Sequence, residues 1–371
     1  MRLIHTSDVR LDASYAGCGL GSAFGRRRRE GLRAVLRALL NRAATWPADA
    51  VLIAGNLFDV ERIEPATVRF LQESFESVGP VPIFIAPGDR DPFIEDSPYA
   101  LYPWPDNVTI FREADWRMRE VEDARLVVHG FGDDGSVSRG DCFARLSLEA
   151  RKGWSQVALA CLARHADAAV PFDTACLTSL PLDYVALGLG SVVQPVTVDG
   201  GVAVYCSGAP EGHGFDETGL RHYLEVEIDA ERVRVTPAVS SRAVFERVTL
   251  DCAEVGEAGR ILDVLASYVS VEAGRCLLEL TFGGACLPEL RRDWRELQTI
   301  VESAFASVVL YDDSVPADGE RPALAALVRG LREEMRNAPD PPREAFVRRA
   351  LQLGASALCG APLGEEGTDE G

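Results

Sequence analysis

The sequence has few histidines, and its basic residues are fewer than its acidic ones. It has five histidines among 371 residues, and its 38 lysines and arginines are outnumbered by 57 aspartates and glutamates. A net charge of −19 excludes a surface that is basic throughout, because phosphates are neutralised by lysine and arginine. A local patch remains compatible with this balance. The four arginines at 26–29 stand just ahead of a helix, where such a run is usually only a solvated helix start and contact with nucleic acid is the alternative.

Long apolar runs and paired cysteines are missing as well. No stretch of 18 or more apolar residues occurs, so no membrane-spanning segment is expected. The first residues have no apolar signal core, which makes the cytoplasm the expected location. Nine cysteines are scattered without a CxxC pair, which favours buried thiols in a reducing compartment over a disulfide framework or a zinc site.

The pattern that is present is α/β. A chain of this length predicts two or three structural units. In the first 130 residues, short apolar strands at 2–6, 49–55 and 81–86 alternate with helices at 24–44 and 65–77. Continuous apolar strands separated by helices predict parallel strands that are buried on both faces. Functional residues in such sheets collect on the loops at the carboxyl ends of the strands.

The rest of the chain divides further. Residues 125–240 are richer in strands and predict, with the preceding part, a mixed two-sheet sandwich flanked by helices. A smaller unit follows, with strands at 244–250 and 275–282 and a helix at 259–269. Two amphipathic helices are expected at about 322–337 and 344–357, before an acidic tail whose composition predicts disorder. We therefore expect domains at 1–240, 241–320 and 321–362, and a tail at 363–371.

Four loops follow strands where such a sheet would place its chemistry. They read Asp8-Val9-Arg10, Gly55-Asn56-Leu57-Phe58-Asp59, Gly88-Asp89-Arg90-Asp91 and Gly188-Leu189-Gly190-Ser191. With their flanks, and with the segment from Tyr205 to Glu211, they resemble the calcineurin-like metallophosphoesterases, in particular the SbcD and YhaO type of DNA-repair exonuclease subunit. The resemblance covers about residues 1 to 240. It implies a four-layer αββα sandwich with a small α/β capping domain and C-terminal helices.

The same resemblance implies that the metal site is degenerate. The family uses D-x-H, GD, GNHD, a lone histidine and G-H-x-H to hold two divalent metals that activate a water. Asp8 retains the first aspartate, whereas the other positions carry residues that differ from the family's ligands: Arg10, Asn56, Asp89, Arg90, Cys161 (where the alignment may slip by one), Leu189 and Ser191. Leucine cannot ligate and arginine repels cations. We expect no catalytic residue, no bound metal and no other cofactor, with weakly bound Mn²⁺ or Mg²⁺ as the alternative.

The incoming residues suggest a replacement for the metals. Arg10 and Arg90 add two fixed positive charges beside Asp8, Asp89 and Asp91, so we hypothesise guanidinium–carboxylate pairs in the cleft. These arginines are also candidates for contact with a phosphate. The plainer interpretation of Asp12, Asp59 and Asp91 is as loop caps or salt-bridge partners. His5 and His129 are expected in the core, and His165, His213 and His222 lie apart from the motifs.

The function that these observations favour is that of a non-catalytic, SbcD-like scaffold subunit that associates with an SbcC-like coiled-coil ATPase in DNA repair or DNA-end processing. A homodimer, and DNA contact through the complex, are further expectations implied by the family; a membrane partner is not. Two alternatives remain: an active metal-dependent phosphoesterase or DNA exonuclease with a non-standard metal site, and a free-standing binding module. Residues expected to bind the partner lie on the C-terminal helices, where they can also pack on their own domain: Leu324, Leu327, Leu331, Phe346, Val347 and Leu351.

Overall fold

The computed structural model describes residues 1–135, 142–162, 172–199, 201–229, 232–286 and 288–316, together with Gly330, Leu331, Glu334 and Ala350. It divides into two compact units, Met1–Ala243 and Val244–Gly371. The helices expected to bind a partner and the acidic tail lie outside the described residues, except for those four positions, which are helical.

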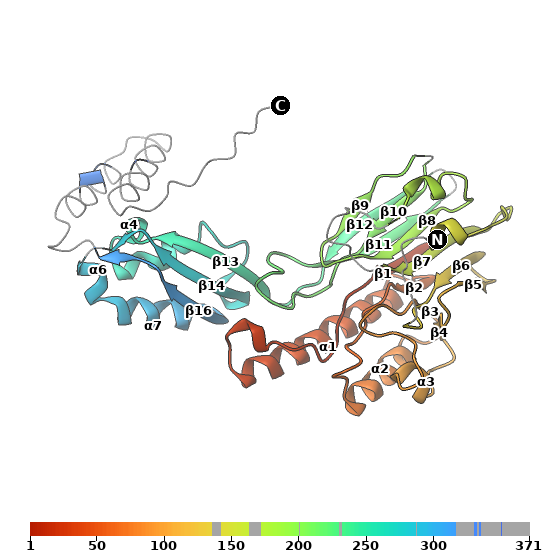
Figure 1. Cartoon of the computed structure of the whole chain (residues 1–371), viewed down its shortest axis with the longest axis horizontal. Coiled ribbons are helices and arrows are strands. Elements are labelled where there is room, and N and C mark those ends of the chain that lie inside the picture. The colour runs from red at the N-terminus through yellow and green to blue at the C-terminus, as the bar shows by residue number, and fades with distance from the viewer. Residues whose placement is uncertain are drawn as a thin grey trace. The chain divides into compact units, whose positions relative to one another are not determined.

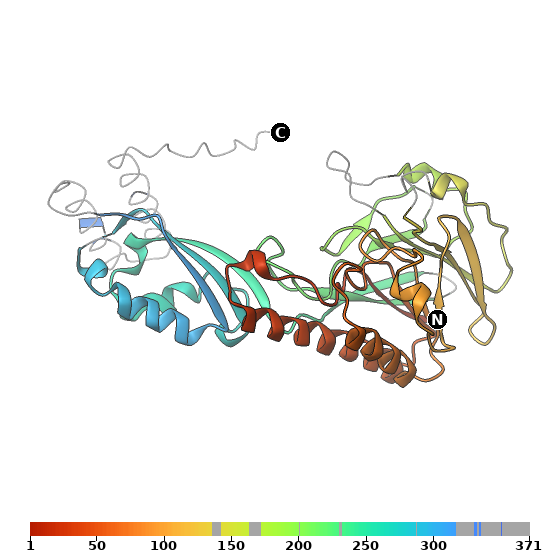
Figure 2. The same ribbon diagram turned by 60° about the horizontal axis from the view of Figure 1, so that its bottom comes forward.

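The first unit contains two mixed six-stranded sheets (Figures 1 and 2). In the first sheet, four parallel strands are extended by an antiparallel pair, in the order β12-β11-β1-β2-β3-β4. Its strands are β1 (Arg2–Thr6), β2 (Ala50–Ile53), β3 (Ile83–Ile85), β4 (Val108–Ile110), β11 (His222–Ile228) and β12 (Val233–Val239). The predicted strands at 2–6, 49–55 and 81–86 are thus found as parallel neighbours.

The second sheet also has four parallel strands at its centre, with an antiparallel strand on each side, in the order β5-β6-β7-β8-β10-β9. Its strands are β5 (Trp116–Val121), β6 (Leu126–Phe131), β7 (Ser155–Cys161), β8 (Tyr184–Gly188), β9 (Gln194–Val196) and β10 (Ala203–Cys206). Side chains of both sheets form one apolar core, which contains Leu52 and Phe84 from the first sheet and Leu159 and Tyr184 from the second. This is the α/β sandwich that the sequence predicts.

Helices α1 (Ser22–Thr45) and α2 (Pro65–Ser77) lie side by side next to the first sheet (Figures 1 and 2). The buried positions of α1 follow the helical period, including Leu32, Val35, Leu36 and Leu39. A short helix, α3 (Pro98–Leu101), follows β3. On the second sheet the apolar outer side packs against 3-10 turns, Phe143–Arg145 and Thr174–Leu177; no described α-helix belongs to this side, so the expected fourth α layer is not seen in this part of the chain.

The second unit has a parallel sheet of β13 (Val244–Asp251), β14 (Cys276–Gly283) and β16 (Ser307–Asp312) with its own apolar core. The helices are α4 (Cys252–Val255), α5 (Ile261–Leu265), α6 (Pro288–Arg292) and α7 (Trp294–Ala304), and β15 (Ala285–Cys286) pairs with β17 (Val315–Pro316). The predicted helix at 259–269 is shorter than expected. After Leu265 the chain turns, and the hydroxyl of Tyr268 reaches Glu254 Oε2 at 2.6 Å.

Two further expectations concern cysteines and membranes. Among the eight described cysteines no disulfide is formed, and all but Cys176 are buried, as predicted. In the described part of the chain, no helix combines the length and the apolar character that crossing a bilayer requires.

Candidate functional site

The candidate site lies where parallel strands of both sheets end at the same edge. The loops after β1, β2 and β3 come from the first sheet, and the chain after β7, β8 and β10 comes from the second. Asp8, Asn56 and Cys161 meet there, although they are far apart in the sequence. These loops therefore lie together at one edge, as the parallel-sheet pattern predicted.

The site loops have an unusual backbone. Asp8, Arg10, Asp12 and Asn56 all have left-handed φ angles, of 52°, 49°, 61° and 55°. Non-glycine residues seldom adopt this conformation unless the surrounding structure holds them in it. Here the two loops continue the pairing of β1 with β2: the amide of Asp8 donates to the carbonyl of Gly55 at 3.0 Å, and that of Arg10 to Asn56 at 2.9 Å.

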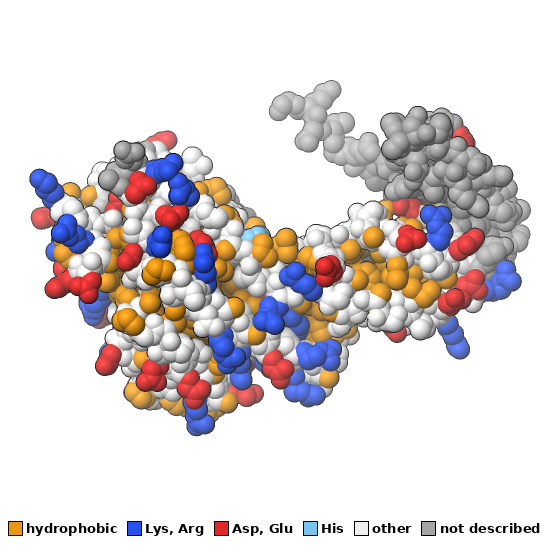
Figure 3. Space-filling model, turned by 180° about the vertical axis from the view of Figure 1, so that it is seen from behind, with side chains coloured by type: hydrophobic (Ala, Val, Ile, Leu, Met, Phe, Trp, Pro, Cys, Tyr) orange, Lys and Arg blue, Asp and Glu red, His pale blue; other side chains and the backbone are white. Residues whose placement is uncertain are grey.

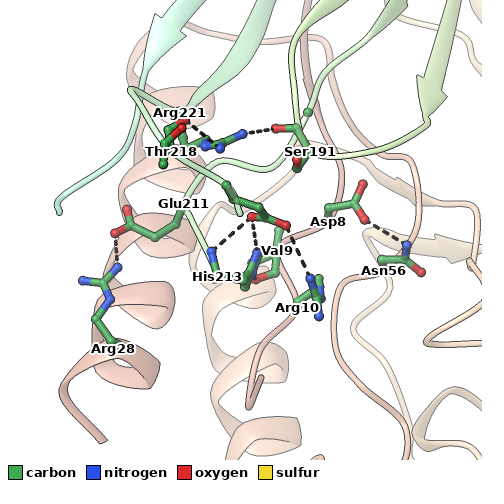
Figure 4. A network of polar contacts seen from close by, with 12 residues as sticks. Asp8, Val9, Arg10, Arg28, Asn56, Ser191, Glu211, His213, Thr218 and Arg221 are labelled. Atoms are coloured by element: carbon green, nitrogen blue, oxygen red, sulfur yellow. Dashed lines mark hydrogen bonds and ion pairs between the residues drawn. The ribbon is translucent and has the colours of Figure 1, made fainter. Parts of the chain in front are cut away.

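A side-chain hydrogen bond joins the two loops. Asn56 Nδ2 donates to Asp8 Oδ1 at 2.9 Å, and Asn56 Oδ1 accepts from the backbone amide of Arg90 at 3.1 Å (Figure 4). Because the carboxylate only accepts and the Arg90 amide only donates, both contacts require the same orientation of the Asn56 amide. Asn56 therefore presents an NH₂ group to Asp8 and has its oxygen already engaged.

Asp8 retains one unused oxygen. Its Oδ2 is buried and has no hydrogen-bond partner among the described residues. Burial raises the pKa of Asp8, although hydrogen bonds from Asn56 and Ser7 and the charges of His213 and Arg10 oppose the shift. Asp8 is thus a carboxyl group with one oxygen held by Asn56 and the other open to a further donor.

Cys161 closes the floor of the site. A Cβ atom added at Gly55 would lie 2.5 Å from Cys161 Sγ, and one at Gly88 would lie 2.7 Å from the same sulfur and 2.3 Å from Asn56 Oδ1. Gly55 also has a left-handed φ of 76°. Both positions are therefore restricted to glycine by the close approach of Cys161 and Asn56.

Asp91 organises the loop that follows β3. Its Oδ1 accepts from the amides of Asn56 at 2.8 Å and Gly88 at 2.7 Å. Its Oδ2 accepts from the amide of Leu57 and the hydroxyl of Tyr99, each at 2.8 Å. Burial raises the pKa of Asp91 to about 6, while these four donors favour the ionised form. Asp91 is a loop cap, as the plainer interpretation predicted.

The guanidinium of Arg10 does not pair with the aspartates named in the sequence-based hypothesis. It lies 3.6 Å from Glu217 Oε1, because Asp91 is fully engaged by the loop amides and Asp8 faces Asn56. His213 holds Glu217 from the other side: its backbone amide and Nδ1 are 3.1 and 3.0 Å from Glu217 Oε2, and Nε2 is 3.2 Å from the carbonyl of Val9. Both ring nitrogens of His213 therefore face oxygen atoms.

The environment of Glu217 favours its charged form. Burial alone would raise the pKa of this carboxyl, but the hydrogen bonds and charge of His213 and the charge of Arg10 hold it below its ordinary value. His213 was placed apart from the motifs in the sequence, and the structure corrects this. In the sequence, only the spacing of four residues between His213 and Glu217 points to this contact.

Arg90 and Asp89 are exposed, and among the described residues neither side chain has an ion pair. The expected pairing of Arg90 with the cleft carboxylates is therefore wrong. Asp89 and Arg90 instead line a hollow of about 410 Å³ beside the site loops. Its charged lining comprises three arginines and three acids: Arg10, Arg62, Arg90, Asp59, Glu61 and Asp89.

Buried charged residues that the sequence did not indicate lie around the site. Glu211, which is fully buried, pairs with Arg28 and accepts from the backbone amides of Arg242 at 2.7 Å and Ala243 at 3.2 Å (Figure 4). Arg28 is thus a core residue, although the arginine run was expected to be solvated. Its neighbours Arg26 and Arg27 are exposed.

Arg221 reaches the loop that would carry the last pair of family ligands. Its Nη1 donates to the carbonyl of Ser191 at 2.7 Å and its Nη2 to that of Thr218 at 2.9 Å (Figure 4). Leu189 in the same loop is buried. These residues fix the loop and offer no metal ligand.

The remaining sequence candidates are structural. Asp12 Oδ2 accepts from the amide of Glu64 at 3.0 Å and the hydroxyl of Thr67 at 2.5 Å, which ties the first site loop to the start of α2. Asp59 lies 3.6 Å from Arg62. His5 and His129 are buried in the core, bonded to Tyr184 and Gln156, as expected. His222 lies on β11, and His165 is outside the described residues.

The residues of the site do not fit a two-metal centre. No three histidine, cysteine, aspartate or glutamate side chains among the described residues are grouped so that they could share a metal. At the ligand positions, Asn56 directs its NH₂ group at Asp8, Leu189 is apolar and Arg10 is cationic. A bridging site needs anionic or neutral lone-pair donors directed at one point, and of the family's ligand positions only Asp8 retains its residue.

Comparisons with known proteins agree with the resemblance. Residues 1–160 match the family described as calcineurin-like phosphoesterase. The uncharacterized metallophosphoesterase YhaO of Bacillus subtilis (strain 168) is 24% identical over 264 residues, a match that covers 68% of this chain and 64% of YhaO. The crystal structure of TT1561 of Thermus thermophilus is similar at 13% identity and a TM-score of 0.37, over 64% of this chain and 98% of that one. Residues 1–160, less than half of the chain, are thus similar to the calcineurin-like phosphoesterases.

Proposed function

We propose that this chain is a non-catalytic, nuclease-derived subunit that acts by binding rather than by hydrolysis. The observation that carries the proposal is the hydrogen bond from Asn56 Nδ2 to Asp8 Oδ1, at the place where a bridging carboxylate would hold two cations. With Asn56 at this position the bridging carboxylate is missing. The amide of Asn56 also occupies one oxygen of Asp8, the ligand that remains.

Two further features support loss of the family's chemistry. The position of the usual catalytic acid carries Arg90, whose guanidinium stays protonated and cannot transfer a proton at neutral pH. The positive charge of Arg10 lies close enough to Asp8 to interact with its carboxylate. The same charge opposes the binding of a metal cation by Asp8. Restoring one ligand would leave both obstacles in place.

The binding partner that we propose is an SbcC-like coiled-coil ATPase, in DNA repair or DNA-end processing. Support comes from the resemblance to SbcD-type subunits and from the apolar stripes in the sequence at 322–337 and 344–357, which suit a helix-in-groove contact. Five of the six proposed contact residues lie outside the described part of the chain, the exception being Leu331.

The partner is tested by co-expression with the coiled-coil ATPase encoded nearest to this chain and co-purification of the two proteins. The expected result is a stable complex that Leu324→Asp together with Leu351→Asp disrupts, while Leu101→Asp, at an exposed apolar position of α3, leaves it intact. A complex that survives the helix substitutions, or no complex at all, contradicts this part of the proposal.

A second candidate is an active phosphodiesterase with a non-standard, single-metal site. One observation favours it: Asp8 Oδ2 is buried without a partner among the described residues and could accept one cation. Incubation of the protein with Mn²⁺ and a chromogenic phosphodiester separates the two candidates. The scaffold function predicts no turnover above that of the Asp8→Ala protein, whereas turnover that Asp8→Ala abolishes supports the enzyme.

A further inference from the structure

The guanidinium of Arg10 is left without a hydrogen-bond acceptor. None of its nitrogens makes a hydrogen bond to a described side chain or carbonyl, and its Nε is buried without a partner. The nearest carboxylate oxygen, Glu217 Oε1, is 3.6 Å away, which is an ion-pair distance but too long for a hydrogen bond. The side chain is 22% exposed, so the protein itself removes most of the solvent that would satisfy it.

Such a group is rarely left unsatisfied. Leaving a buried donor without an acceptor costs the full loss of its hydration, and most buried polar groups in native proteins have a partner. Arg10 is held in this position by a left-handed backbone and by the pairing of its amide with the carbonyl of Asn56. The arrangement is therefore imposed by the fold, and it leaves the guanidinium able to donate to an acceptor from outside the chain.

The hollow beside Arg10 shows where that acceptor would lie. Arg62 and Arg90 line the same space of about 410 Å³, and both side chains extend from exposed positions. Three guanidiniums around one small volume match the oxygens of a tetrahedral anion, because each can donate two parallel hydrogen bonds. Arg90 is free to do so, since it has no ion pair among the described residues.

The acidic residues of the lining favour an anion with a single phosphoryl group. Asp59 is balanced by Arg62 at 3.6 Å, but Glu61 and Asp89 also face the hollow. They would repel the neighbouring phosphates of a polymer while leaving room for a single phosphoryl group. On the face shown in Figure 3, basic and acidic side chains of the described residues are interspersed, and the whole chain carries a net charge of −19.

We propose that this hollow is a metal-independent site for a small phosphate monoester, whose phosphoryl oxygens accept hydrogen bonds from Arg10, Arg62 and Arg90. The phosphoryl group shares Arg10 with Glu217, which stays bound to His213. The ligand is bound and released without hydrolysis. This absence of hydrolysis is the one part of the inference that rests on the proposed function. Because Glu217, Glu61 and Asp89 oppose the anion, binding is expected in the millimolar to high micromolar range.

The test is calorimetric titration of the full-length protein with inorganic phosphate and with glycerol phosphate, in buffer containing a metal chelator. Both ligands should bind, and glycerol phosphate should be recovered intact by phosphorus NMR. Arg10→Asn removes the guanidinium but tolerates the left-handed backbone, and Arg90→Ala changes an exposed side chain. Each should weaken binding about tenfold, the loss expected for charge-assisted hydrogen bonds.

Arg69→Ala is the matched control, because Arg69 is an exposed arginine of α2 that does not line the hollow. It should bind both ligands as the natural protein does. The proposal is overturned if neither ligand binds, or if Arg90→Ala and Arg10→Asn bind as well as Arg69→Ala. It is also overturned if an oligonucleotide without terminal phosphates binds more tightly than glycerol phosphate. Hydrolysis of bound glycerol phosphate would leave the site standing and contradict the proposed function instead.

Discussion

Asn56 Nδ2 lies 2.9 Å from Asp8 Oδ1, so the centre of the site is an amide–carboxylate hydrogen bond. Asn56 Oδ1 is bound to the amide of Arg90, which leaves Asn56 no free lone pair directed at Asp8. The bond links the loops after β1 and β2. This bond and the buried charges around it lead to four predictions.

Asn56→Asp should destabilise the protein instead of restoring a metal site. The new carboxylate would face Asp8 at hydrogen-bond distance, and two like charges so close cost about 1–3 kcal/mol. Urea unfolding at neutral pH measures the loss, with the exposed Asn41→Asp on α1 as the matched control. Excess Mn²⁺ should recover none of the lost stability, because Arg10, Leu189 and Ser191 still supply no ligand. Full recovery with Mn²⁺ would show that the ligand set has been misjudged.

Glu217→Gln should lower stability by about 1–2 kcal/mol at pH 7, because it removes the charged acceptor of His213 and the partner of Arg10. The folded-state pKa of Glu217 lies below its ordinary value of 4.5. Its contribution is therefore present above pH 4.5 and is lost as the pH falls through the folded pKa. Unfolding of both proteins from pH 7 to pH 3 should show the two curves converging in acid. A difference that stays constant over this range would assign the effect to packing alone.

Glu211→Gln should be the most damaging single change around the site. It leaves the buried Arg28 without its carboxylate and weakens the hold on the backbone of Arg242 and Ala243. Breaking a buried ion pair from one side costs about 3–5 kcal/mol. Glu227→Gln, in an exposed pair with Arg234 at 3.1 Å, is the control and should cost under about 1 kcal/mol. Similar losses of stability in the two variants, measured by thermal unfolding, would show that the buried Arg28–Glu211 pair matters no more than an exposed one.

His5 should make the protein sensitive to acid. Burial of its ring lowers the pKa to about 3, from an ordinary value of 6.5. Between these values the unfolded chain binds a proton that the folded chain does not, so stability falls as the pH drops from 6.5 towards 3. The slope is at most about 1.4 kcal/mol per pH unit. His5→Gln, which can still bond to Tyr184, should flatten the dependence of the unfolding free energy on pH. An unchanged slope would mean that other groups cause the acid sensitivity.

Much of the fold is encoded locally and could be predicted. The strands at 2–6, 49–55 and 81–86 are mainly apolar because most of their residues are buried on both faces, and α2 covers Pro65–Ser77 as its proline start and apolar spacing indicated. The edge of the sheet that carries the site follows from the same parallel pattern. Strand β5 was not predicted, because its mostly exposed positions weaken the apolar signal, and helix α7 was missed although Leu297 and Val301 recur at helical spacing.

The sequence predicted which loops lie together at this edge, but it did not predict which side chains pair with one another. Arg10 was expected beside Asp91, yet Asp91 is saturated by Asn56, Gly88, Leu57 and Tyr99, three of which use backbone amides that the sequence does not reveal. Glu217 and His213 lie more than 200 residues after Arg10 and carry no motif of their own. Arg28 resembled its exposed neighbours, and only the position of Glu211 in space makes it a core residue.

The central claim is that the residues at this edge no longer hold a dinuclear metal centre. The most direct measurement is metal content by mass spectrometry after equilibration of the purified protein with excess Mn²⁺ and removal of unbound ions, alongside Asp8→Ala. Our account predicts that far less than one equivalent remains, with no difference between the two proteins. One or two equivalents of Mn²⁺ that are retained by the natural protein and lost in Asp8→Ala would contradict it.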